Sequence, residues 1–138
     1  MSPSRILVVD DHEQFRQLVC SLLRKSAEFQ IVGEASDGLE AIQKAETLHP
    51  DLILLDIHLP KLNGIEVVIR LRTVAPHTKI LVLSQETSPD VVEEALSLGA
   101  LGYVHKIRVA NELLPAVKAV LAGKEFVGGG LKRPQTPE

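Results

Sequence analysis

Reactive polar side chains follow four of the apolar runs in this sequence. They are Asp10 and Asp11 after VV, Asp56 after LILL, Ser84 after LVL, and Lys106 after GYVH. Taken singly, each is explained by a helix cap or a solvated turn, and an aspartate is not needed merely to end a strand. Their joint placement, after runs that read as strands, indicates a site.

Three carboxylates, a hydroxyl and an ammonium define the chemistry of this set. Two carboxylates about 5 Å apart repel by roughly 3 kcal/mol at an effective dielectric constant of about 20, so the cluster must bind a proton or a cation. Oxygen ligands without sulfur favour Mg²⁺, with Mn²⁺ as the second choice. Lys106 and Ser84 suit phosphoryl oxygens. Because the set has no His–Ser or His–Cys couple, we predict phosphoryl chemistry with a carboxylate nucleophile.

The elements that must position these residues alternate along the chain. Apolar runs recur at residues 6–9, 29–32, 52–55, 80–83 and 101–104, and they are continuous, as in strands buried on both faces. Segments with helical periodicity lie between them. This alternation predicts an α/β fold, (βα)5, with a doubly wound, flavodoxin-like parallel sheet of five strands in the order 2-1-3-4-5. Ligands of such sheets bind outside the carboxyl ends of strands 1 and 3.

Capping residues mark several predicted helix starts. Asp37 and Asn63 each stand three residues before a glutamate, the capping-box pattern. Ser88, followed by a proline, predicts the start of the fourth helix. Pro115 lies early in the fifth helical segment, where it is expected to remove a backbone hydrogen bond.

Length and composition exclude several classes of protein. The chain has 138 residues, 45% of them apolar and 24% charged, as expected for one globular domain. A net charge of −3 without a basic run argues against nucleic-acid contact by this segment. The single Cys20, the lack of a signal peptide and the lack of a long apolar run predict a cytoplasmic chain without membrane contact. The scattered histidines lack the spacing of a zinc site.

These motifs resemble the receiver domain of bacterial two-component response regulators. The resemblance covers about residues 5–123 and rests on VVDD, LILLDIHLP followed by KLNG, LVLS and GALGYVHK. Pro60 and Gly64 fall four and eight residues after Asp56, as in that family. The start RILVVDDH and the segment VLAGKEFV are most similar to members that precede a helix-turn-helix DNA-binding output domain.

The resemblance assigns a role to each acid. It implies that Asp56 is the phosphoacceptor, which attacks the phosphohistidine of a sensor histidine kinase. It also implies that Mg²⁺ is held by Asp11, Asp56 and the backbone carbonyl of His58, with Asp10 acting through water. Lys106 would pair with Asp56 before the reaction and with the phosphoryl group after it.

The resemblance further implies a switch. Ser84 would bond the phosphoryl group and Tyr103 would turn inward with it, which changes the surface of the fourth helix, fifth strand and fifth helix. His58 and Glu86 occupy positions that tune the dephosphorylation rate in this family, so we expect an altered acyl-phosphate lifetime. Ile107 replaces the proline that many members carry after the lysine.

A Mg²⁺-dependent phosphatase with an aspartyl nucleophile is the alternative, because it shares Asp, Mg²⁺ and Lys. Such enzymes usually carry a second acid two residues after the nucleophile, where this chain has His58. They also need a cap domain or long insertions, and no loop here has the length. The resemblance therefore implies a phosphoacceptor signalling domain, which catalyses only its own phosphorylation and dephosphorylation.

Residues 1–123 are predicted to form the receiver domain, and residues 124–138, rich in Gly and Pro, a flexible tail or linker. The partners implied by the resemblance are a sensor histidine kinase, an output domain or effector protein, and a second copy of the chain in a homodimer.

Overall fold

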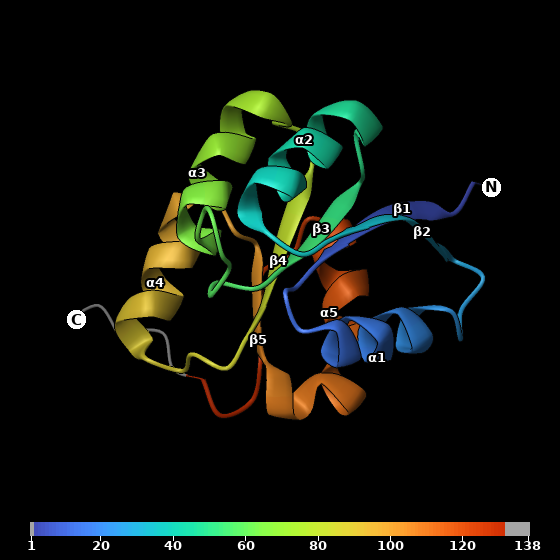
Figure 1. Cartoon of the computed structure of the whole chain (residues 1–138). Coiled ribbons are helices and arrows are strands. Elements are labelled where there is room, and N and C mark those ends of the chain that lie inside the picture. The colour runs from blue at the N-terminus through green and yellow to red at the C-terminus, as the bar shows by residue number, and fades with distance from the viewer. Residues whose placement is uncertain (1, 132–138) are drawn as a thin grey trace.

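A computed structural model describes residues 2–131 and shows helices packed on both faces of a parallel sheet (Figure 1). The strand order β2-β1-β3-β4-β5-β6 contains the predicted order 2-1-3-4-5. The strands are β1 Ser4–Val9, β2 Phe29–Ala35, β3 Leu52–Leu55, β4 Lys79–Ser84, β5 Gly102–His105 and β6 Phe126–Val127. The helices are α1 Glu13–Leu23, α2 Gly38–Leu48, α3 Gly64–Val74, α4 Pro89–Leu98 and α5 Val109–Leu121, with a 3-10 turn η1 Lys106–Arg108 before α5.

Two apolar clusters cover the two faces of the sheet, and successive residues of one strand enter different clusters. Leu7 and Val9 of β1 pack with α2, α3 and α4, whereas Ile6 and Val8 pack with α1 and α5. Figure 1 shows these two helix groups on opposite sides of the sheet. Because both faces are buried, the central strands are apolar without alternation, which is why they appear as continuous runs in the sequence. Cys20 is buried in the second cluster as a free thiol.

The predicted caps are confirmed at two helices. Asp37 and Asn63 accept hydrogen bonds from the third backbone N–H of α2 and α3, at 2.8 and 3.0 Å. Ser88 precedes α4 as predicted, but its side chain makes no capping hydrogen bond. Pro115 lies inside α5 without ending it.

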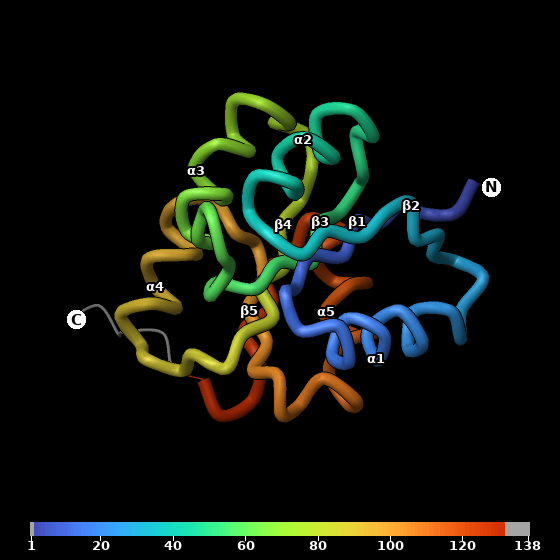
Figure 2. Tube along the Cα trace, viewed as in Figure 1, coloured from blue at the N-terminus to red at the C-terminus, as the bar shows by residue number. Residues whose placement is uncertain are grey.

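The sheet has a sixth strand where the sequence predicted only five. Residues 126–127 pair in parallel with Gly102 and Tyr103 of β5, and Figure 2 shows the chain after α5 returning along that edge. This strand lies within the predicted tail, of which residues 132–138 are outside the described part of the chain. A two-residue strand carries no readable period of its own, so only the neighbouring β5 edge determines it.

Candidate functional site

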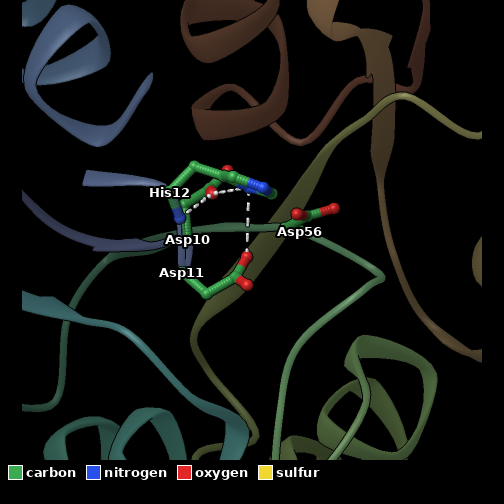
Figure 3. Close-up of side chains that lie close together, drawn as sticks. All are labelled: Asp10, Asp11, His12 and Asp56. Carbon is green, nitrogen blue, oxygen red and sulfur yellow. Dashed lines mark hydrogen bonds and ion pairs between the residues drawn. The ribbon is translucent and has the colours of Figure 1, made fainter. Parts of the chain in front are cut away.

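The topology brings the predicted acids together at the carboxyl edge of the sheet. β1 and β3 are neighbours with Val9 opposite Leu55, so the next residues, Asp10 and Asp56, project from the same place. Each is only 2% exposed. Figure 3 shows that their side chains lie close to those of Asp11 and His12.

Lys106 joins the two buried acids. Its Nζ lies 2.8 Å from Asp10 Oδ2 and 3.1 Å from Asp56 Oδ2, and its side chain is 8% exposed. The ammonium also sits 4.5 Å from the centre of the Phe15 ring, so an aromatic face covers it. The pair with Asp56 was predicted, whereas the shorter contact with Asp10 was not.

Burial and charge act in opposite directions at this cluster. Burial raises the pKa of Asp56 above its ordinary value, although the ammonium of Lys106 offsets part of that effect. Burial alone would lower the pKa of Lys106, but the hydrogen bond to Asp10 and the charges of both acids outweigh it, so that pKa is raised. The site therefore keeps a charged lysine beside a carboxylate that is destabilised as an anion, a group for which an added cation is favourable.

The same acids form a group that is able to hold a metal ion. Ligand atoms of Asp10, Asp11, His12 and Asp56 all lie within 4.8 Å of one another. Carboxylate oxygens dominate the set, which fits a hard divalent cation such as Mg²⁺. The backbone N–H of His58 lies 3.3 Å from Asp56 Oδ1, which places that loop against the Asp56 carboxylate.

His12 is a site residue that the sequence analysis missed. Its Nδ1 is 3.3 Å from Asp10 Oδ1 and 3.2 Å from Asp11 Oδ1, and its backbone N–H donates to Asp10 Oδ1 at 2.8 Å. His12 precedes α1 but makes no side-chain cap, which leaves its ring free to turn toward the acids. Its position directly after the acidic pair was the available signal.

Arg16 contacts the backbone of Asp10 and was not identified from the sequence. Its Nη1 donates to the backbone carbonyl of Asp10 at 2.7 Å, while its Nε donates to Glu34 Oε1 at 2.8 Å. The guanidinium thus fixes the end of β1 against β2, because a planar fork of donors can hold two acceptors at once.

Ser84 and Tyr103 meet through the loop after β4. Ser84 is fully buried, and its Oγ accepts a hydrogen bond from the backbone N–H of Glu86 at 3.0 Å. The Tyr103 hydroxyl donates to the backbone carbonyl of Glu86 at 2.8 Å, and its side chain is turned inward with 0% exposure. Burial raises the pKa of Tyr103 to about 12, so its hydroxyl stays a donor.

His58 and Glu86 connect the two loops that flank Asp56. His58 Nε2 lies 3.6 Å from Glu86 Oε2, with the histidine side chain 66% and the glutamate side chain 32% exposed. A hollow of about 320 Å³ between these loops and the starts of α3 and α4 is lined by both residues. The two positions, which the resemblance assigns to the same property, thus contact each other.

Comparison with known proteins adds an independent line of evidence. Residues 6–118 match the response regulator receiver domain family. A Pseudomonas aeruginosa protein described as a transcriptional regulator is 46% identical over 94% of this chain and 62% of its own length. The nitrate/nitrite response regulator protein NarL of Escherichia coli is 39% identical over 94% of this chain and 60% of its own length.

A solved two-component response regulator of the LuxR family, from Aurantimonas sp. SI85-9A1, has the same fold. It aligns with a TM-score of 0.86 and 32% identity, over 91% of this chain and 89% of that chain. Against the curated relatives, by contrast, the chain spans only about three-fifths of their length, 62% and 60% in the two cases above. Within residues 2–131, no helix has the length and apolar character required to cross a membrane.

Proposed function

Because the chain belongs to the response regulator receiver domain family, we propose that Asp56 accepts a phosphoryl group from the phosphohistidine of a sensor histidine kinase. An Asp56 carboxylate oxygen attacks phosphorus, the P–N bond breaks, and its electron pair returns to the imidazole, leaving an acyl phosphate on Asp56. The observation that carries the proposal is the position of Lys106 Nζ, 3.1 Å from Asp56 Oδ2 inside the acidic cluster.

Each neighbour of Asp56 has a role in this step. Lys106 pairs with the Asp56 carboxylate before the attack and with a phosphoryl oxygen after it. The negative charge then lies on the phosphoryl group attached to Asp56, within reach of the same buried ammonium. Asp11, Asp56 and the backbone carbonyl of His58 would hold Mg²⁺ or Mn²⁺, with Asp10 acting through water, and the bound ion would supply positive charge for the phosphoryl oxygens. The chain catalyses only its own phosphorylation and dephosphorylation.

Ser84 and Tyr103 form the proposed switch. In the structure, Ser84 Oγ accepts a hydrogen bond from the Glu86 N–H at 3.0 Å. When this hydroxyl donates to a phosphoryl oxygen, it moves away from the Glu86 N–H. The backbone carbonyl of Glu86 accepts a hydrogen bond from the Tyr103 hydroxyl at 2.8 Å, so one residue contacts both Ser84 and Tyr103. New charge at the strand ends therefore biases the loop that holds Tyr103, and with it the α4-β5-α5 surface.

Metal binding gives a test that is independent of phosphoryl transfer. Added Mg²⁺ is expected to raise the free energy of unfolding, by about 2.7 kcal/mol at one hundred times its Kd, because it binds the folded acidic cluster. Replacement of Asp11 by Asn should remove most of this gain, and replacement of the exposed Glu13 by Gln should leave it intact. Denaturant unfolding with Mg²⁺ and with chelator measures both. Equal gains in the two variants would contradict the assignment of Asp11.

The contact between His58 and Glu86 sets the lifetime of the acyl phosphate. Replacing both residues by Ala is expected to speed phosphate loss, since removing two side chains from the loops that flank Asp56 would give water more room beside it. A pair this exposed contributes at most about 1 kcal/mol, which corresponds to about a fivefold change in rate. The half-life of labelled protein measures the effect. Glu94→Ala, on the same hollow, is the control; the same half-life in all proteins would reject this role.

The remaining assignments concern the cellular context. We place the chain in the cytoplasm, with residues 1–123 as the receiver domain and a sensor histidine kinase as donor. The chain matches only about three-fifths of the length of its curated relatives, which favours an output domain or effector protein as the recipient of the signal. Homodimerisation through α5 is a further proposed interaction. The net charge of −3 and the lack of a basic run in the sequence argue against nucleic-acid contact by this segment itself.

The experiment for the acceptor itself is incubation with acetyl phosphate and, in parallel, with a small phosphomonoester. Transient labelling from acetyl phosphate without turnover of the monoester is expected. Repeated hydrolysis of the monoester would contradict the proposal.

A further inference from the structure

Residues 126–131, here called the strap, run along the free edge of β5. Val127 is the partner of Tyr103 in the β5–β6 pairing, and the N–H of Gly128 donates to the Tyr103 carbonyl at 2.9 Å. A turn then follows, in which the N–H of Leu131 donates to the Gly128 carbonyl at 3.3 Å. The strap is therefore hydrogen-bonded to the backbone of Tyr103, the residue whose side-chain hydroxyl donates to the loop after β4.

A second anchor comes from α5. The N–H of Gly129 donates to Glu112 Oε2 at 2.8 Å, and Glu112 Oε1 is buried without a hydrogen-bond partner among residues 2–131. A Cβ on Gly128 would lie only 2.5 Å from Glu112 Oε1. The glycines thus let the strap pass close over a carboxylate, and a larger residue at Gly128 would force the two apart.

The strap and the Tyr103 ring share one apolar cluster. Val127 and Leu131 pack against the cluster that contains Tyr103, on the α4 side of the sheet. Figures 1 and 2 show the chain after α5 following β5 at the edge of the sheet. A tyrosine ring that left its buried position on that side would have to displace these side chains.

We propose that the strap and the inward position of Tyr103 stabilise each other, so that the state of Asp56 sets the docking of the segment that leaves the sheet at β6. A continuous set of contacts joins them: Ser84 to Glu86, Glu86 to the Tyr103 hydroxyl, and the Tyr103 backbone to Gly128. The link from Tyr103 to the strap stands on these contacts alone, whereas the link to Asp56 rests on the proposed function.

The sequence offers a direct reporter, because Tyr103 is the one tyrosine and there is no tryptophan. In the wild-type chain its fluorescence should be poorly quenched by acrylamide. Glu112→Ala removes the acceptor of Gly129, and Gly128→Val pushes the strap off Glu112; each is expected to raise the quenching constant about fivefold. Asn111→Ala, an exposed neighbour on α5, should change nothing. Circular dichroism identifies the variants that keep the fold.

Amide hydrogen exchange at Gly128 and Gly129 measures strap docking separately. Beryllofluoride with Mg²⁺, a phosphoryl mimic, is expected to slow this exchange about tenfold and to restore low quenching in Glu112→Ala. A strap released in either variant while Tyr103 stays protected from acrylamide would overturn the proposal. Saturation of the Asp56 site without a change in strap exchange would also overturn it. A chain that binds no beryllofluoride yet shows the quenching effect contradicts the proposed function and supports the strap coupling.

Discussion

Asp56→Asn is expected to abolish labelling by a phosphoryl donor and, at neutral pH, to stabilise the fold by about 1–3 kcal/mol. A carboxamide cannot form the acyl phosphate. The substitution also removes one of two buried carboxylates that compete for a single lysine, and Lys106 keeps its 2.8 Å contact with Asp10. Labelling with acetyl phosphate and chemical denaturation in chelator measure the two effects.

The pH dependence of that stability gain has a definite sign. The folded-state pKa of Asp56 is raised by burial, so Asp56 binds its proton more tightly in the folded than in the unfolded state. The wild type should then lose stability as pH rises above the ordinary value of 3.8 and through the raised pKa of Asp56, and Asp56→Asn should lose less.

Asp37 provides a control of opposite sign. The backbone hydrogen bond from Glu40, with the charge of Lys61 assisting, lowers the pKa of Asp37. Its contribution is therefore present above its ordinary pKa and is lost as pH falls through the lowered one. Asp37→Asn, which retains a good N-cap, should remove this acid-side loss. If Asp56→Asn and Asp37→Asn changed the pH dependence of the free energy of unfolding in the same direction, the electrostatic description of the site would be contradicted.

Lys106→Met is expected to lower the free energy of unfolding at neutral pH by about 3–5 kcal/mol, because two buried carboxylates then lack their counter-ion. Methionine keeps most of the side-chain volume, so the loss reports charge rather than packing. Protonation relieves the repulsion, and the deficit should shrink as pH is lowered toward 4.

The control for this substitution is Lys61→Met. Lys61 pairs with Asp37 at 3.5 Å, but its side chain is 63% exposed, and such a pair contributes about 0–1 kcal/mol. Denaturation at neutral and acidic pH compares the two lysines. Losses of the same size, or a deficit of Lys106→Met that does not respond to acid, would show that Lys106 is not the counter-ion of the cluster.

The fold was predictable because each central strand is buried on both faces and several helix starts carry a local signal. Continuous apolar runs indicate strands that are buried on both faces, and Asp37 and Asn63 mark the helix starts that follow them. The strand order follows from right-handed crossovers. Strand β6 has no such signal. Its two residues lie next to a Gly-rich segment, and their pairing with the edge of β5 gives them a structure.

The site shows the same division between local and tertiary information. Strand ends placed Asp10, Asp56, Ser84 and Lys106 at one edge, since the carboxyl ends of parallel strands meet there. Side-chain directions were not available from spacing: the bridge from Lys106 to Asp10 and the turn of His12 toward the acids depend on rotamers that packing selects. The contact between His58 and Glu86 joins two loops, and no sequence period connects them.

The most direct measurement follows a radiolabelled phosphoryl group from acetyl phosphate onto the wild-type chain, with Mg²⁺ or with chelator, and locates the bond. We expect Mg²⁺-dependent label on the peptide that contains Asp56. Hydroxylamine should release it as phosphate and leave a hydroxamate there, because the nitrogen attacks the acyl carbon. Label that appears equally in chelator, resists hydroxylamine or lies on another residue would contradict the central claim.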